Sequence, residues 1–254
     1  MITAGIDCGA KNIKIVIIKD GKIAAKTMVP AGLDTKAAAN EAYAAALRQA
    51  GVGKGNVQKI FATGAGRKEI DFSTGEVTEV SADARGINYM LPRVRTVIDV
   101  GAEEGRTVRL DNAGKVIDFA INEKCAAGAG TFVETMARAL ETTVDKMGDL
   151  STRSTKEVAM TAQCAVFAES ELVTLVHSQT SKPDIARAVL TAIADRIVSM
   201  VRRVGLAQDV ACVGGVSLNT GFIAALEKEL EVEVTVPADP QYVSAIGAAV
   251  LAGE

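Results

Sequence analysis

The sequence is poor in the side chains that carbohydrate and nucleic-acid surfaces use. Its 254 residues include no tryptophan, and aromatic residues make up only 4% of the chain. This scarcity argues against a surface that binds sugars or single strands by stacking. The formal net charge is −3, which gives no sign of a nucleic-acid partner.

Long apolar runs are lacking as well. No stretch approaches the roughly 20 apolar residues that cross a membrane, so we expect no membrane partner. The N-terminus, MITAGIDCG, has no basic residues ahead of an apolar core, so we expect no secretory signal. Disulfides are then not expected. No two of the four cysteines form a CxxC motif, and each thiol is either a small buried group or a reactive ligand. They are Cys8, Cys125, Cys164 and Cys212.

What the sequence does contain is one pattern of strands and helices that occurs twice. The first copy predicts strands at 2–7, 13–19, 23–29 and 57–63, and helices from the Asp34 cap to Gly51 and at 83–91. The second predicts strands at 96–100, 107–110, 116–121, 210–213 and 232–236, and helices at 130–141, 163–179, 183–204, 219–230 and 240–252.

Both copies open with three strands in succession. This favours a duplicated α/β lobe over a Rossmann fold, which would not begin with a three-stranded meander. We expect the lobes to span residues 1–94 and 95–254, with the final helix packing back on the first lobe.

The first candidate phosphate loop lies in GIDCGAKN, residues 5–12, between the first two expected strands. Glycine lets a backbone approach an anion closely, and the N–H groups of a turn can cradle phosphate. Asp7 at the strand end is placed to hold Mg²⁺ through water. The alternative is an ordinary hairpin in which Asp7 is an exposed turn residue.

Two later segments repeat this device. DVGA, residues 99–102, puts Asp99 and then Gly101 at the end of an apolar strand. GGV, residues 214–216, follows another strand and precedes a helix, so adenosine could lie on its backbone. The order of the three segments across matching halves favours a nucleotide site. The GxxxxGK[ST] and GxGxxG patterns are absent, which excludes a P-loop enzyme.

Two of the cysteines stand where thiolates are favoured. Cys125 precedes a glycine-rich turn that opens a helix, and Cys164 lies at the start of a second expected helix. The positive end of a helix dipole stabilises thiolate, the form that binds metal. An iron–sulfur cubane needs four ligands, so two chains related by a two-fold axis could share one cluster. The alternative is that both are small buried residues. Cys8, Cys212 and His177 are expected in packing, surface or capping roles.

At these residues the sequence resembles a known family, the activator ATPases of 2-hydroxyacyl-CoA dehydratases and benzoyl-CoA reductases (BadF/BadG/BcrA/BcrD type). The motifs that carry the resemblance run through nearly the whole chain: GIDCGAKNIK, DVGAEEGR, NEKCAAGAGTF, AQCAVFAESE, RRVG and VGGVSLNTGF. NEKCAAGAG, DVGAEEGR and the stretch 185–205 look closest to the benzoyl-CoA reductase D subunit. The dehydratase activators more usually have GlyGlyGlnAsp where this chain has GAEE, residues 101–104.

The resemblance implies a fold and a mechanism. The fold would be two acetate kinase/Hsp70/actin-like (ASKHA, ribonuclease H-like) lobes. A homodimer, or a heterodimer with a sister ATPase subunit, would bind MgATP and hold one bridging [4Fe–4S] cluster. Ferredoxin or flavodoxin would supply one electron. ATP binding and hydrolysis to ADP would send it on to a cluster-containing reductase or dehydratase component, in the cytoplasm of an anaerobic cell.

The family's roles map onto residues of this sequence. Cys125 and Cys164 would ligate the cluster. Asp99, which positions water or Mg²⁺, and Glu103 would be catalytic. The remaining nucleotide contacts would be Asp7, Gly9, Ala10, Lys11, Asn12, Gly101, Ala102, Gly128, Gly214, Gly215 and Val216.

Two other functions remain open from the sequence. A small-molecule kinase of the same fold would explain the nucleotide loops but not the paired cysteine motifs, and no convincing acidic base for a sugar pocket is evident. A nucleotide-binding scaffold without redox chemistry is the second alternative, which the altered DVGAEEGR loop permits.

Overall fold

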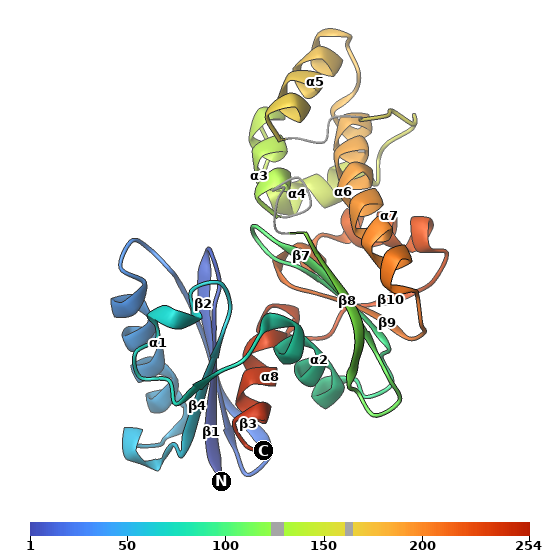
Figure 1. Ribbon diagram of the computed structural model, residues 1–254. Coiled ribbons are helices and arrows are strands. Elements are labelled where there is room, and N and C mark those ends of the chain that lie inside the picture. The colour runs from blue at the N-terminus through green and yellow to red at the C-terminus, as the bar shows by residue number, and fades with distance from the viewer. Residues whose placement is uncertain (123–129, 161–164) are drawn as a thin grey trace. The chain divides into compact units, whose positions relative to one another are not determined.

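The structure is a computed structural model that describes residues 1–122, 130–160 and 165–254. The chain forms two compact units (Figure 1). Unit 1 consists of Met1–Val97, Leu110–Ile117 and Pro237–Glu254, and unit 2 of Ile98–Arg109 and Asp118–Val236. The expected boundary at residues 94 and 95 stays a prediction, although the C-terminal helix does belong to unit 1.

Unit 1 is built on a five-stranded mixed sheet of order β3-β2-β1-β4-β5. Its central strand β1 is antiparallel to β2 and parallel to β4. The elements of this unit are β1 (Ile2–Cys8), β2 (Asn12–Lys19), β3 (Lys22–Pro30), α1 (Thr35–Ala50), β4 (Lys59–Thr63), β5 (Gly75–Glu76), α2 (Glu79–Met90) and α8 (Val243–Leu251).

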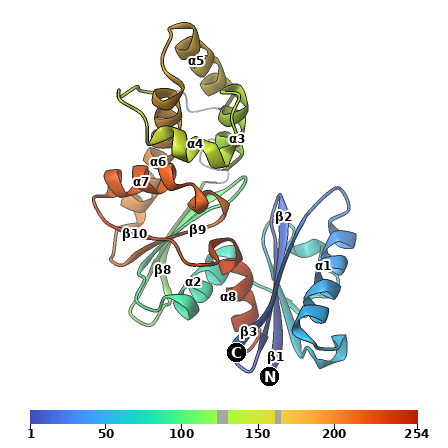
Figure 2. The same ribbon diagram turned by 180° about the vertical axis from the view of Figure 1, so that it is seen from behind.

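The two faces of this sheet are covered by different helices, α1 on one side and α8 on the other (Figure 2). Because side chains alternate along a strand, Ile13, Ile15 and Ile17 of β2 join the core with α1, while Val16 and Ile18 join α8. Helix α8 can come so close because β1 has Gly5 there: a Cβ atom at that position would lie 2.0 Å from the Ala245 carbonyl oxygen.

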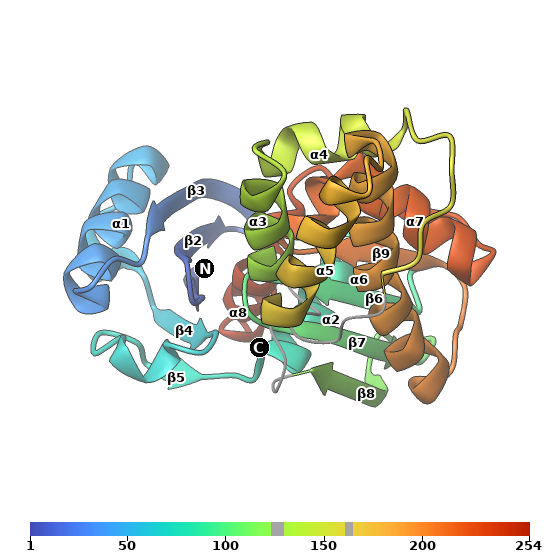
Figure 3. The ribbon, with the colours of Figure 1, turned by 90° about the horizontal axis from the view of Figure 1, so that it is seen from above.

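Unit 2 is built on a second sheet of order β10-β9-β6-β7-β8. Its helices α3 to α7 pack on one another around the apolar face of α6, and Figure 3 shows four of them, α3 to α6, gathered together. The elements are β6 (Thr96–Val100), β7 (Gly105–Leu110), β8 (Val116–Asn122), α3 (Gly130–Ala139), α4 (Val144–Ser151), α5 (Ala165–His177), α6 (Lys182–Val204), β9 (Val210–Val213), α7 (Thr220–Leu230) and β10 (Val234–Thr235).

The two sheets have the same topology. In each, the first strand is central, the next two extend one side in order, and the fourth and fifth extend the other side. The prediction of two duplicated α/β lobes, each opening with three strands, is therefore confirmed.

Most predicted elements are present with ends shifted by a few residues. One helix begins earlier than predicted, and two elements were not predicted. Helix α2 begins at Glu79 rather than residue 83, because Thr78 caps it by accepting a hydrogen bond from the Ser81 N–H. Helix α4 and the short strand β5 were not predicted. No helix in the described part of the chain is long and apolar enough to cross a membrane.

Candidate functional site

The first candidate loop is a tight turn between β1 and β2 in unit 1. The Gly9 N–H donates to the Asn12 carbonyl at 3.1 Å, which closes the turn. Asp7, at the end of β1, is 8% exposed. Its carboxylate accepts a hydrogen bond from Lys14 Nζ at 2.8 Å. Asp7 is thus a buried, paired acid rather than the exposed turn residue of the ordinary hairpin alternative.

A second segment of unit 1 braces this turn from behind. After β4 the chain passes through Gly64 with φ +90°, and the Gly66 N–H donates to the Cys8 carbonyl at 2.9 Å. A Cβ atom on Gly64 would lie 2.4 Å from that carbonyl oxygen and 2.7 Å from Asp7 Oδ1. Glycine is therefore required here by both the backbone angle and the close approach.

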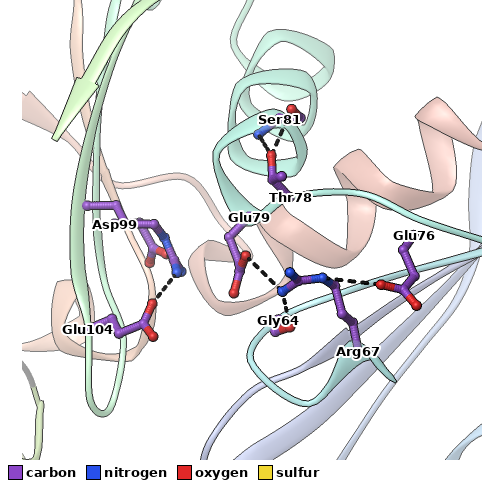
Figure 4. A network of polar contacts seen from close by, with 9 residues as sticks. Gly64, Arg67, Glu76, Thr78, Glu79, Ser81, Asp99 and Glu104 are labelled. Atoms are coloured by element: carbon purple, nitrogen blue, oxygen red, sulfur yellow. Dashed lines mark hydrogen bonds and ion pairs between the residues drawn. The ribbon is translucent and has the colours of Figure 1, made fainter. Parts of the chain in front are cut away.

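Arg67 holds the segment that contains Gly64 and Gly66 in place (Figure 4). Its guanidinium donates to the Gly64 carbonyl at 3.0 Å. It also pairs with Glu76 at 3.4 Å and with Glu79, in the first turn of α2, at 3.5 Å. The position of Gly64 behind Asp7 is thus tied to the start of a helix.

The second candidate loop, in unit 2, has the same backbone design. The Gly101 N–H donates to the Glu104 carbonyl at 2.9 Å. Asp99, at the end of β6, is 5% exposed and pairs with Arg106. Arg106 also donates from Nη1 to Glu104 Oε2 at 2.9 Å, and Figure 4 shows the Asp99 and Glu104 side chains. Glu103 is exposed at the tip of the turn.

Gly214 has the same relation to Asp99 that Gly64 has to Asp7. It follows β9 with φ +84°. A Cβ atom there would lie 2.3 Å from Asp99 Oδ1 and 2.4 Å from the Val100 carbonyl oxygen. The chain continues as a single 3-10 turn, Gly215–Leu218, before Asn219 caps α7 by accepting from the Phe222 N–H. The predicted strand–GlyGly–helix segment therefore adjoins the second acid.

The start of α3 is hydrogen-bonded to the second turn. The Gly130 N–H donates to the Gly101 carbonyl at 2.8 Å, and the Thr131 N–H donates to the Ala102 carbonyl at 2.8 Å. The Thr131 hydroxyl donates to the same Ala102 carbonyl at 2.7 Å. The helix that follows the Cys125 segment is thereby attached to an acid-bearing turn.

The two candidate cluster ligands, Cys125 and Cys164, and the candidate nucleotide contact Gly128 lie outside the described residues. The structure does describe the helices that follow them. Helix α3 begins at Gly130, α5 begins at Ala165, and the two helices pack on each other.

The described cysteines are unsuited to bind a cluster. Cys8 is 1% exposed and Cys212 is fully buried. Burial, with a contribution from the Asp7 charge, raises the pKa of the Cys8 thiol to about 11. Burial raises the pKa of the Cys212 thiol further. Since thiolate is the metal-binding form, these two thiols fit the packing roles expected of them, and His177 is exposed at the end of α5.

Sequence reasoning missed four residues of these turns: Lys14, Gly64, Glu104 and Arg106. The basic residues carried a readable signal, because each follows its acid by seven positions at the start of the next strand. Gly64 and Glu104 carried none, because a single glycine after a strand and one more acid in a polar turn are common features.

Comparison with known proteins agrees with this arrangement. The model of the BadF/BadG/BcrA/BcrD ATPase family matches residues 4–252. The activator of lactoyl-CoA dehydratase from Anaerotignum propionicum is 38% identical over 255 residues, which is 100% of this chain and 98% of that protein. The benzoyl-CoA reductase D subunit from Thauera aromatica is 34% identical, covering 98% of this chain and 92% of that one. The likeness to the reductase is therefore present, but no greater than the likeness to this dehydratase activator.

Solved structures show the same fold. The activator of 2-hydroxyisocaproyl-CoA dehydratase from Clostridium difficile, with bound ADPNP, superposes with a TM-score of 0.92 at 35% identity, covering 99% of this chain and 94% of that one. A ROK family glucokinase from Streptomyces griseus superposes with a TM-score of 0.60 at 14% identity, covering 100% and 99%. The second likeness concerns the fold alone, and together they confirm the ASKHA class of the duplicated lobes.

Proposed function

The chain belongs to the BadF/BadG/BcrA/BcrD ATPase family, and we propose from this that it is an activator ATPase that uses MgATP to drive single electrons into a partner enzyme. The observation that carries the proposal is the pair of buried acids, Asp7 and Asp99, each at the end of a central strand and each followed by a hydrogen-bonded glycine turn.

The nucleotide contacts follow from the turns. The first turn supplies backbone N–H groups and Lys11 for phosphate oxygens, and Asp7 for a water of the Mg²⁺ shell. In the second, Asp99 orients the attacking water or a Mg²⁺-bound water, and Glu103 accepts its proton at the exposed tip. The full set of proposed contacts is Asp7, Gly9, Ala10, Lys11, Asn12, Asp99, Gly101, Ala102, Glu103, Gly128, Gly214, Gly215 and Val216.

The cluster ligands are proposed from the chemistry of the four thiols. Cys8 and Cys212 are buried with raised pKa values, which leaves Cys125 and Cys164 as donors. Two thiolates from one chain fill half of a [4Fe–4S] cluster, so a second chain, identical or a sister ATPase subunit, supplies the others. Such a cluster accepts and releases one electron at a time.

The reaction balances as two linked steps. Reduced ferredoxin or flavodoxin gives up one electron to the activator, and ATP with water becomes ADP and phosphate as that electron passes to the partner. The bonds from Gly130 and Thr131 to the second turn support coupling between these steps, because a change in the turn moves the start of α3. The partner is an acyl-CoA dehydratase or reductase component with its own cluster.

The test is to purify the protein without oxygen and measure iron, sulfide and ATP hydrolysis. We expect about four irons per two chains, lost in Cys125→Ser and in Cys164→Ser but kept in the matched control Cys212→Ala. ATP hydrolysis should be measurable in the wild type. Wild-type protein purified without iron would refute the electron-transfer role. Iron that is retained in both the Cys125→Ser and the Cys164→Ser variants would refute the assignment of these cysteines as ligands.

A further inference from the structure

The two acid turns place a basic residue at the same point. Lys14 follows Asp7 by seven residues, and Arg106 follows Asp99 by seven. Both stand near the start of the strand that leaves the turn, and both pair with the acid that ends the strand entering it. Two basic residues in matching positions of two lobes indicate a shared task beyond the packing of either lobe.

The two pairs differ in one respect. The Lys14 ammonium is a point charge and makes its ion pair with Asp7. The Arg106 guanidinium is a planar fork, and its two terminal nitrogens pair with different acids, Nη2 with Asp99 and Nη1 with Glu104. A guanidinium held at both ends has less freedom to turn than one held at a single end. Arg106 is therefore oriented by two acids, one at each terminal nitrogen.

Burial makes the Arg106 contacts matter. The exposed fraction is 5% for Asp99 and 9% for Arg106. A buried charge is stable when it is paired and hydrogen-bonded, and removing one partner leaves the other uncompensated. Asp99 also has Gly214 directly behind its Oδ1, so the carboxylate is confined on one side by backbone and on another by the guanidinium.

We propose that Arg106 is a positioning residue for ATP hydrolysis: it fixes the orientation of the Asp99 carboxylate and is itself fixed by Glu104. It acts through Asp99, without touching ATP. The inference rests on the proposed function, since Asp99 must have a substrate to act on. Lys14 serves Asp7 in the same way through their ion pair.

This arrangement predicts an order among variants. Arg106→Lys keeps a charge for Asp99, as Lys14 does for Asp7, but cannot reach two acids at once. Arg106→Met removes both ion pairs. Glu104→Gln replaces the ion pair at Nη1 with at most a neutral hydrogen bond and leaves the pairing of Nη2 with Asp99. We therefore expect activity to fall in the order wild type, Glu104→Gln, Arg106→Lys, Arg106→Met.

The experiment measures kcat for ATP hydrolysis, the Kd of ATP and the thermal midpoint for each variant of the full chain purified without oxygen. We expect Arg106→Met to lower kcat about 100-fold while the Kd changes less than about 3-fold, because misplacing a catalytic group costs rate more than binding. Arg106→Lys should recover at least about 10-fold of that loss. Arg95→Met is the control, because that arginine binds the Pro92 and Val94 carbonyls of its own segment.

A double substitution makes the test independent of whether Arg106→Met folds. If Glu104 acts only through Arg106, Glu104→Gln should add almost nothing to Arg106→Lys, although it lowers kcat alone. Additive losses would overturn the proposal, as would full kcat in Arg106→Met or a loss in Arg106→Lys as large as in Arg106→Met. A wild type that does not hydrolyse ATP would instead refute the proposed function, so the two failures are distinct.

Discussion

The turn after β1 and the turn after β6 share a backbone hydrogen-bonding pattern but carry net charges of opposite sign. Each is closed by the same hydrogen bond from its glycine N–H to the carbonyl three residues on, and each has a glycine of positive φ behind its acid. Residues 5–14 contain two lysines against one aspartate, whereas residues 99–106 contain one arginine against three acids.

This comparison distinguishes the features that the fold of each lobe requires from those that the proposed reaction requires. The glycines and backbone bonds repeat because two copies of one lobe need the same turn. The charges are free to diverge, and local charge attracts ligands of opposite sign. This difference in charge supports the proposed division of roles, in which the first turn binds phosphate oxygens and the second a cation or a polarised water.

Neutralising Asp7 and Asp99 in turn should give the largest difference in ATP hydrolysis between the two turns. We expect Asp99→Asn to lower kcat for ATP hydrolysis about 100- to 1000-fold, because its turn has the charge suited to the reacting water. Asp7→Asn should cost about 10-fold, since Lys11 of its turn would still attract phosphate. Steady-state kinetics at saturating ATP measures both. A loss in Asp7→Asn equal to or larger than that in Asp99→Asn would contradict the division of roles.

Adding a methyl group behind each acid should test the shared geometry. Gly64→Ala and Gly214→Ala each combine positive φ with a contact below 2.5 Å, so each should lower the free energy of unfolding by about 2–4 kcal/mol. Gly51→Ala is the matched control, because it has φ +64° with no atom within 4 Å of the added Cβ and should cost about 1 kcal/mol. Urea unfolding measures all three, and equal costs would show that the close approach to the acids is unimportant.

A third buried acid, Asp184, differs from Asp7 and Asp99 because its partners are hydroxyl and main-chain amide donors rather than a basic side chain. Asp184 accepts hydrogen bonds from the Ser181 and Ser154 hydroxyls and from the Thr155 and Lys156 N–H groups. These donors, led by Ser181, hold the pKa of its carboxyl below the usual range. A lowered pKa stabilises the fold above the unfolded pKa of about 4 and less as pH falls below it.

Asp184→Asn should therefore lower the thermal midpoint at pH 7 by several degrees, because the amide removes the negative charge and keeps only one of the two oxygens that accept the hydrogen bonds from Ser181, Ser154, Thr155 and Lys156. The gap to wild type should narrow as the pH is lowered below about 4. Thermal unfolding from pH 7 to pH 3 gives both quantities. A gap that stays constant over this range would show that the charge of Asp184 does not contribute to stability.

The smallest expected effect concerns Lys11, exposed in the first turn. Lys11→Gln should raise the KM for ATP about 2- to 5-fold at low ionic strength, because an exposed charge attracts phosphate weakly. The difference should fade in ~0.5 M salt, where such charges are screened. Lys115→Gln, on the exposed turn before β8, should leave KM unchanged. A salt-independent effect at Lys11 would indicate a direct, buried contact instead.

Much of the fold could be predicted because the sequence repeats its pattern. Each lobe opens with apolar strands around a glycine turn, and Asp7 and Asp99 end those strands in sequence as they do in the structure. Helix α4 was missed because VDKMGDLS is only eight residues long and has a glycine in its middle. It is stabilised by packing on α6 and α7, which no local pattern reveals.

The candidate site was predictable in its acids and glycines but not in their partners. Glu103 was predicted to be catalytic from the resemblance, and that role stays a prediction. Its neighbour Glu104 pairs with Arg106, because neighbouring side chains in a turn point in different directions. Gly64 lies 57 residues from Asp7 in sequence, so its role depends on the parallel pairing of β1 with β4. The roles proposed for the acids and glycines, and those proposed for Cys125, Cys164 and Gly128, all stay predictions.

The attachment of α3 to the second turn has a consequence for how this chain can vary. Its acceptors are the main-chain carbonyls of Gly101 and Ala102, and two of its three donors are main-chain N–H groups. Main-chain groups are the same in nearly every residue, so side chains in this turn can be exchanged while the attachment persists. Length is a different matter. One residue inserted between Gly101 and Glu104 would disturb the position of these carbonyls relative to the helix. The attachment of α3 therefore tolerates substitutions in the turn but not insertions.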